Sequence, residues 1–152
     1  PPDVNAESRL HRADAREVAR ASIVLLENRA GTLPLAARGT IALVGPLADS
    51  KLDMLGSWSA AGVPQQAVTL LEGMREAVGD RARVISARGA NVTDDAAIVK
   101  YLNGLNWDEP EVVQDPRPAS EMLAEAVQAA EQADVVVAAV GESRGMSHES
   151  SS

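Results

Sequence analysis

The sequence has no cysteine and no phenylalanine, and only one tyrosine and two tryptophans among its 152 residues. Without cysteine, disulfide bonds and thiolate metal sites are excluded. The hydrophobic fraction is nevertheless an ordinary 45% and is rich in alanine and valine. Small aliphatic side chains of this kind suit helices packed closely on a parallel sheet. No apolar run approaches the roughly 20 residues that a membrane-spanning helix needs, and no signal peptide is recognisable.

Basic residues are also scarce. The sequence has 14 Lys and Arg but 22 Asp and Glu, which gives a net charge of −8. Nucleic acids and anionic membranes both attract clustered Lys and Arg, so neither is expected as a partner. The two histidines, His11 and His148, lie far apart and have no metal-ligand spacing. We therefore expect no metal site.

Alternating helical and strand patterns run along the chain. Apolar periodicity predicts helices over residues 11–26, 68–78, 94–102 and 120–132, and short apolar runs predict strands over residues 40–44, 83–86 and 134–140. Thr93 and Ser120 are the expected N-caps of the last two helices. Residues 90–118, which contain three prolines, are interpreted as an insertion with a loop. Strands that alternate with helices predict an α/β fold with a parallel sheet.

The two ends of the chain suggest how it is divided into domains. Residues 1–10 are polar, begin with two prolines and are interpreted as a linker, and residues 11–152 form the α/β domain. No helix is predicted after the last strand, so one edge or face of the sheet is expected to be uncovered, which favours self-association. Because the chain does not begin with Met and stops soon after a strand, we expect it to be a piece of an enzyme.

The candidate site lies beyond the last strand, since ligands of open α/β sheets bind at the carboxyl ends of the strands. Glu142 and Glu149 are carboxylates on this terminal loop, and two carboxylates are what glycoside hydrolysis uses. The Gly-flanked loop over residues 56–62 carries Trp58, whose indole suits stacking on a sugar ring or packing onto the core.

Other kinds of site receive less support. The loop after residues 40–44 has neither Gly-x-Gly-x-x-Gly nor Gly-Lys-Ser/Thr, which argues against a nucleotide-binding domain. Residues 91–93, Asn-Val-Thr, match a glycosylation acceptor, but the helix-cap interpretation of Thr93 is favoured. A non-catalytic carbohydrate-binding or interaction module on the same scaffold stays open as an alternative.

Several motifs in order along the chain resemble glycoside hydrolase family 3, in particular its bacterial periplasmic β-glucosidases. The motifs that carry the resemblance are residues 5–12, 15–20, 43–50 (Leu-Val-Gly-Pro-Leu-Ala-Asp-Ser), 56–62 (Gly-Ser-Trp-Ser-Ala-Ala-Gly), 89–93, 140–142 and 146–151 (Met-Ser-His-Glu-Ser-Ser). Together they cover nearly the whole chain.

The resemblance implies a fold and the roles of individual residues. It implies a three-layer α/β sandwich with a mostly parallel sheet, of which this chain is the first half, and a separate barrel domain, absent here, that supplies an Asp nucleophile. Glu149 matches the acid/base position, and Trp58 matches an aromatic residue that flanks the leaving sugar. His148 is expected to assist substrate binding near Glu149, and Glu142 to orient the loop through hydrogen bonds.

The same resemblance implies the reaction and its setting. The substrate is expected to be a β-glucoside or a short β-glucan, hydrolysed in the periplasm with no cofactor or metal. One carboxylate cannot perform a retaining reaction alone, so the isolated chain is expected to be inactive.

Overall fold

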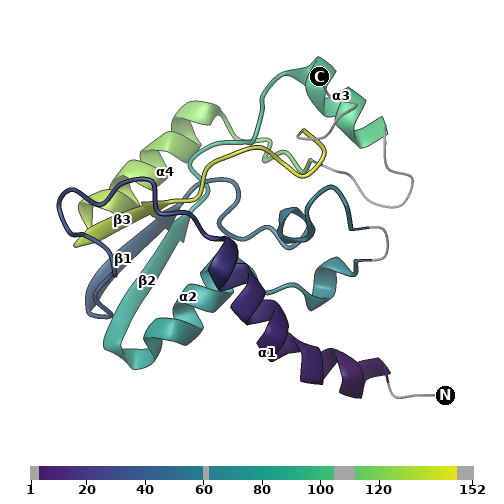
Figure 1. The fold of residues 1–152 in the computed structure, drawn as a ribbon. Coiled ribbons are helices and arrows are strands. Elements are labelled where there is room, and N and C mark those ends of the chain that lie inside the picture. Colours follow the sequence, from purple (N-terminus) through teal and green to yellow (C-terminus); the bar gives the residue numbers. More distant parts are fainter. Residues whose placement is uncertain (1–3, 60–61, 105–111, 147–152) are drawn as a thin grey trace. The chain divides into compact units, whose positions relative to one another are not determined.

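The computed structural model describes residues 4–59, 62–104 and 112–146, with the side chains of residues 4–10 left aside. The chain divides into two compact units, residues 1–36 and 37–152. The first unit contains helix α1 (Val4–Ser22), and the second contains the sheet and the remaining helices (Figure 1).

Helix α1 is shifted from the predicted range of residues 11–26. It begins at Val4, within the stretch that the sequence suggested was a linker, and it ends at Ser22. The Ser22 hydroxyl donates to the carbonyl of Ala19 at 2.8 Å, and the next residues are the β-branched Ile23 and Val24. Both features weaken a helix, so the prediction of four further helical residues was wrong. The domain boundary at residue 10 stays a prediction.

The second unit is built on a parallel sheet of three strands within the described residues. The strands are β1 (Gly39–Val44), β2 (Ala82–Ala87) and β3 (Val135–Ala138), in the order β2-β1-β3. Ile41 of β1 stands beside Val84 of β2 and Val135 of β3. The predicted α/β class and parallel sheet are confirmed. β3 forms one edge of the described sheet, and self-association through it stays a prediction.

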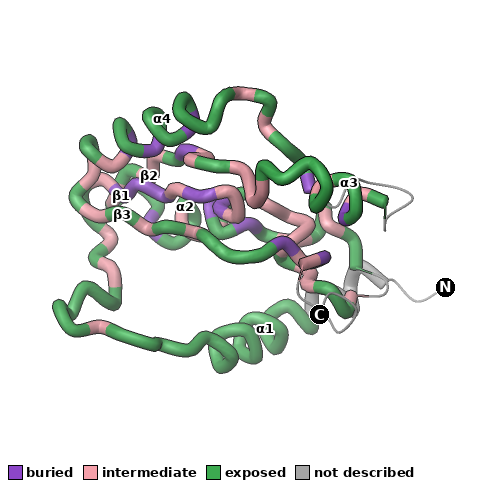
Figure 2. Tube along the Cα trace, turned by 90° about the horizontal axis from the view of Figure 1, so that it is seen from above, coloured by how far each residue is buried: buried purple, intermediate pink, exposed green. Residues whose placement is uncertain are grey.

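Helices cover both faces of the sheet and make three layers (Figure 1). Ala42 and Leu43 are consecutive residues of β1, so their side chains point to opposite faces. Ala42 packs with alanines of α4 (Ala119–Glu131), and Leu43 packs with Leu71 of α2 (Leu70–Val78). Figure 2 shows a run of buried residues in the middle of β1. Small side chains on the α4 face allow the close packing that the composition suggested.

Two helix starts differ from the predicted caps. Helix α3 (Ala96–Gly104) is capped by Asp95, whose Oδ1 accepts from the backbone N–H groups of Ala97 at 2.8 Å and Ile98 at 3.2 Å. Among the described residues, the Thr93 hydroxyl accepts from Asp95 N–H and from no N–H of the helix, so Thr93 is not the cap. Helix α4 follows Pro118 without any side-chain cap, and Ser120 lies inside its first turn. Short 3-10 turns at Asp53–Leu55, Pro64–Gln66 and Gly79–Arg81 complete the elements.

The exits of β1 and β3 lie against each other at Gly45. This glycine has φ +119°, and an added Cβ would overlap the carbonyl oxygen of Ala139 and lie 2.8 Å from its carbonyl carbon. Both neighbours are main-chain atoms that cannot turn away. Gly45 is therefore required where the chain leaves the central strand.

We predict that Gly45→Ala destabilises the protein by roughly 3 kcal/mol, because it adds backbone strain to a clash with another strand. Gly73→Ala is the matched control. Gly73 lies inside α2, and its added Cβ would meet only Val68 Cγ1 at 3.9 Å. That change is expected to stabilise the protein by about 0.5–1 kcal/mol. Urea unfolding followed by circular dichroism measures both, and an unchanged midpoint for Gly45→Ala would contradict the prediction.

Candidate functional site

The carboxyl ends of all three strands meet at one edge of the sheet, where a pocket of about 410 Å³ lies. The chain passes from central β1 to β2 on one side and later to β3 on the other, and the crevice at such a switch is the usual binding place in open α/β sheets. Its lining comes from the segments that follow the three strands, at Gly45, Pro46, Ala48–Asp53, Ser86, Arg88, Val92, Val112, Val113 and Ser143. The predicted location of the site, beyond the strand ends, thus coincides with a cavity.

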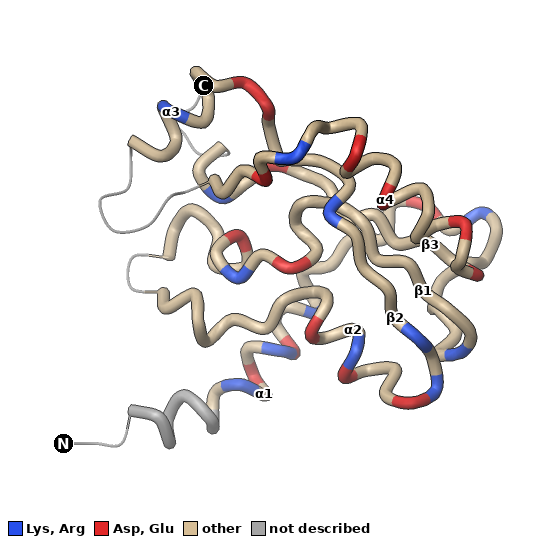
Figure 3. Tube along the Cα trace, turned by 180° about the vertical axis from the view of Figure 1, so that it is seen from behind, with Lys and Arg blue, Asp and Glu red and all other residues tan. Residues whose placement is uncertain are grey.

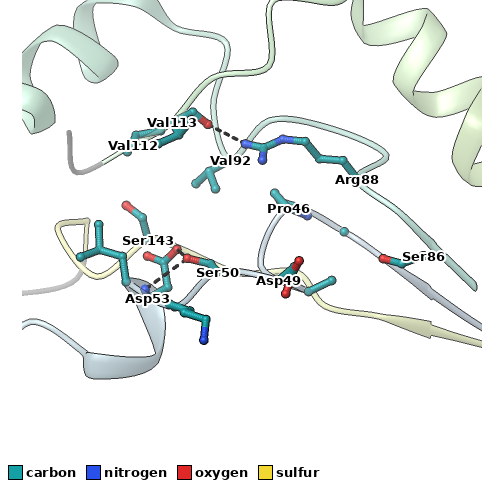
Figure 4. Close-up of a pocket in the computed structure, with 14 residues that line it drawn as sticks. Pro46, Asp49, Ser50, Asp53, Ser86, Arg88, Val92, Val112, Val113 and Ser143 are labelled. Carbon is teal, nitrogen blue, oxygen red and sulfur yellow. Dashed lines mark hydrogen bonds between the residues drawn. The ribbon is translucent and has the colours of Figure 1, made fainter. Parts of the chain in front are cut away.

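The two walls of this pocket differ in chemistry (Figure 4). Val92, Val112 and Val113 lie with Arg88 on one side, and Asp49, Ser50, Asp53 and Ser143 lie on the other. One wall is thus mainly apolar and the other carries carboxylates and hydroxyls. A hydroxylated molecule with apolar faces matches such a lining.

Two buried polar atoms in the pocket lining have no hydrogen-bond partner among the described residues. They are the hydroxyl of Ser143, a residue with only 2% of its surface exposed, and Nε of Arg88. Another nitrogen of Arg88, Nη2, donates to the carbonyl of Val113 at 2.6 Å. Buried polar groups are normally satisfied, so the Ser143 hydroxyl and Arg88 Nε can each bond to a polar molecule in the pocket.

The loop after β1, which lines the pocket, is held in place by Thr69 at the start of α2. Its hydroxyl accepts from Glu72 N–H at 3.1 Å, and the Glu72 carboxylate accepts from Thr69 N–H at 2.9 Å, which forms a capping box. The same hydroxyl donates to Asp49 Oδ1 at 2.7 Å. The bond from Thr69 N–H and, next, that from Lys51 lower the pKa of Glu72. The loop after β1 is thereby held to α2.

A second carboxylate, Asp53, joins the loops that follow β1 and β3. Its Oδ1 accepts from the backbone N–H of Arg144 at 2.9 Å, and its Oδ2 accepts from the Ser50 hydroxyl at 2.5 Å. Asp53 was missed in the sequence. Ser50-x-x-Asp53 has the spacing of a local capping motif, which was a usable signal, but nothing in the pattern indicated the partner 91 residues away.

The predicted site residues are only partly within the described structure. Glu149 and His148 lie outside the described residues. Glu142 is exposed, and among the described residues its carboxylate has no hydrogen bond or ion pair, so its orienting role stays a prediction. Trp58 has 78% of its surface exposed, so the indole does not pack onto the core of this chain. Neither Glu142 nor Trp58 lines the pocket.

Hydrogen bonds between Asn91 and Asp115 join two segments of the predicted insertion. Asn91 Oδ1 accepts from Asp115 N–H at 2.8 Å, and Asn91 Nδ2 donates to the Asp115 carbonyl at 3.1 Å and to Asp94 Oδ1 at 2.9 Å. The Asp115 carboxylate in turn accepts from the guanidinium of Arg117. Asn91 therefore serves the fold with both amide hydrogens, which is a structural role for the residue that begins the Asn-Val-Thr motif.

The electrostatic character of the described elements is mixed. Figure 3 shows Lys and Arg interspersed with Asp and Glu along them. Within the described residues, no group of three or more His, Asp or Glu side chains lies close enough together to hold a metal ion. None of the helices in that part of the chain combines the length and apolar character that crossing a membrane requires.

The fold of this chain recurs in solved structures of beta-glucosidases. The family description "Glycosyl hydrolase family 3 C-terminal domain" matches residues 23–152. The chain therefore belongs to glycosyl hydrolase family 3, as the motifs suggested.

Three relatives show the range of this similarity. A periplasmic beta-glucosidase of Salmonella typhimurium is 62% identical over the whole chain, which spans 20% of that protein. Beta-D-xylosidase 3 of Arabidopsis thaliana is 46% identical over 66 residues, which are 42% of the chain and 8% of that protein. A crystal structure of a beta-glucosidase from Listeria innocua in complex with glucose superposes with a TM-score of 0.65 at 31% identity, covering 93% of this chain and 16% of that one. The chain spans at most a fifth of the length of these relatives.

The contribution of Asp115 to the stability of the predicted insertion is expected to depend on pH. The side-chain bond from Arg117, followed by the bond from Arg117 N–H, lowers the pKa of Asp115 from 3.8 to about 2. A lowered pKa in the folded state means that the ionised carboxylate stabilises the fold above pH 3.8. This stabilisation is lost as the pH falls through about 2.

We predict that Asp115→Asn lowers the urea midpoint near pH 6, and that the gap to the unmodified protein narrows between pH 4 and pH 2. Asp80→Asn is the control, because Asp80 is exposed and has no hydrogen-bond partner among the described residues. Urea unfolding measured across this pH range provides the comparison. A gap for Asp115→Asn that is constant across the range would show that its ionised form does not stabilise the fold.

Proposed function

We propose that this chain is part of a retaining β-glucosidase and supplies its general acid/base, Glu149. The observation that carries the proposal is the 62% identity over the whole chain with a periplasmic beta-glucosidase. The loop that leads to Glu149 follows β3 at the pocket edge of the sheet, which is the side where ligands of such folds bind.

In the proposed reaction, the Glu149 carboxyl gives its proton to the glycosidic oxygen. The bond between the anomeric carbon and that oxygen breaks, the bonding electrons stay with the oxygen, and the nucleophile's carboxylate bonds to the anomeric carbon. Glu149, now ionised, takes a proton from the water that displaces the nucleophile. The two carboxyl groups must lie about 5–5.5 Å apart, so a second domain has to bring the nucleophile to this edge. On its own, the chain is therefore expected to be inactive.

Other residues have assisting roles in this proposal. Trp58 holds the leaving sugar by stacking, which its exposed indole permits. His148 contacts the substrate beside Glu149, and Glu142 orients the terminal loop. The mechanism needs no cofactor or metal.

The proposed substrates are β-linked glucosides or short β-glucans, and the proposed location is the periplasm. Relatives named as xylosidases match shorter stretches of the chain, 66 residues in the case of the Arabidopsis protein. The glucoside-acting relative matches all 152 residues, and it is named as periplasmic. Both choices follow this longer match.

Replacing Glu149 by Gln tests the acid role. In the full-length protein, kcat/KM for an alkyl glucoside is expected to fall by about 10²–10⁴-fold, since the poor leaving group needs a proton. A dinitrophenyl glucoside, whose leaving group departs without a proton, should lose much less. Glu76→Gln, at an exposed position of α2, is the matched control and should change neither value. Equal losses on both substrates would remove Glu149 from the acid role.

The exposure of Trp58 favours a second candidate, a carbohydrate-binding module that needs no partner domain. That alternative predicts saturable quenching of tryptophan fluorescence when the 152-residue chain is titrated with cellobiose. The quenching should vanish in Trp58→Ala and persist in Trp107→Ala, which removes the other tryptophan. If the chain alone does not respond, the binding-module alternative fails, and the proposal that this chain supplies only the acid/base of a larger enzyme is favoured.

A further inference from the structure

Asp53 lies where two functional loops approach each other. It belongs to the loop after β1 and precedes Trp58 by five residues, while its partner Arg144 precedes Glu149 by five residues. Figure 4 shows Asp53 beside Ser50 and Ser143 on the polar wall of the pocket. One carboxylate thus connects the loop that carries Trp58 with the segment that precedes Glu149, the two side chains proposed to act on the substrate.

The bonds of Asp53 are well suited to fixing a loop. A carboxylate that accepts from a backbone N–H forms a charge-assisted bond, about twice as strong as a neutral one. The bond to Arg144 N–H is part-buried, at 2.9 Å, and the bond from Ser50 holds the carboxylate in place at 2.5 Å. Ser50 Oγ also accepts from Asp53 N–H at 3.2 Å, so the carboxylate's own backbone is restrained.

The segment that donates this bond is itself a turn. Met146 N–H donates to the carbonyl of Ser143 at 3.0 Å, which closes residues 143–146. Ser143 is buried, so the turn is anchored at its first residue by burial and at its second by Asp53. The turn that precedes Glu149 in the sequence is thus held at two of its residues.

We propose that Asp53 is a positioning residue for proton transfer, and that it acts by fixing the 143–146 turn from which the chain continues to Glu149. This inference rests on the proposed function, because it presupposes that Glu149 is the proton donor. A displacement of about 1 Å in a reacting group can cost up to 10²-fold in rate. Loss of the Asp53 carboxylate therefore impairs the step that needs the proton, even though Asp53 does not touch the substrate.

The test compares Asp53→Ala and Asp53→Asn in the full-length protein. For Asp53→Ala, kcat/KM on an alkyl glucoside is expected to fall by about 10–100-fold, while the value on a dinitrophenyl glucoside falls less than ~3-fold. An asparagine retains an acceptor for Arg144 N–H and a group that can bond to Ser50. Asp53→Asn should therefore recover most of the kcat/KM on the alkyl glucoside that Asp53→Ala loses.

Asp134→Ala is the matched control. Asp134 Oδ2 accepts from the backbone N–H of Thr40 at 2.8 Å, so its bond is of the same kind, but it lies at the amino end of the strands. Asp134→Ala is expected to lower the unfolding temperature without changing the ratio of the two kcat/KM values. Ser50→Ala takes the place of Asp53→Ala if that variant does not fold. It should lower the ratio of kcat/KM on the alkyl glucoside to kcat/KM on the dinitrophenyl glucoside, by a smaller factor than Asp53→Ala.

The possible results separate the two proposals. An unchanged ratio in Asp53→Ala, or in Ser50→Ala where that variant replaces it, overturns the positioning role when Glu149→Gln shows its expected dependence on the leaving group. Equal losses on both substrates for Asp53→Ala overturn it as well. If Glu149→Gln itself lacks that dependence, the proposed acid/base role fails, whatever Asp53 does.

Discussion

The fold depends on the parallel pairing of β1 with both of its neighbours. Ile41, Ala42 and Leu43 are buried, and every strand-to-loop exit that forms the pocket is placed by the register of this pairing. Where β1 ends, the chain continues the pairing, because Gly45 N–H donates to the Ala87 carbonyl and Leu47 N–H donates to the Ala139 carbonyl. The three loops are therefore held close together before any side chain of the site contributes.

Most of the helices and strands in the unit of residues 37–152 could be predicted from the periodicity of apolar residues. The strands at residues 40–44 and 83–86 and the helix at residues 68–78 have strong local patterns, and they form within two residues of the predicted bounds at each end. Helix α1 and the caps of α3 and α4 were misjudged. Their ends depend on competition between neighbouring side chains, such as Asp95 against Thr93, and a single sequence does not reveal which hydroxyl or carboxylate reaches the free N–H groups.

For the candidate site, topology predicted a position but not the residues that line the pocket, and the function of that position stays a prediction. Topology alone indicated the carboxyl edge of the sheet, and the pocket lies there. Asp53 and Ser143 escaped notice because their importance comes from a contact across 91 residues and from burial. Neither property leaves a local pattern. Glu149 and His148 rest on the family motif, and Trp58 is exposed, as its proposed contact with a sugar requires.

The bonding of Asn91 has a practical meaning for producing the protein. Its amide gives one hydrogen to Asp94 and the other to the carbonyl of Asp115. Asn-Val-Thr is an acceptor sequence for oligosaccharide transfer in eukaryotic secretory cells, where the chain is modified as it emerges. A glycan on Nδ2 would leave a single hydrogen, and it would wedge a bulky group between the two segments that Asn91 now joins. A bacterial expression host, or an Asn91 motif disrupted at Thr93, preserves this junction in recombinant material.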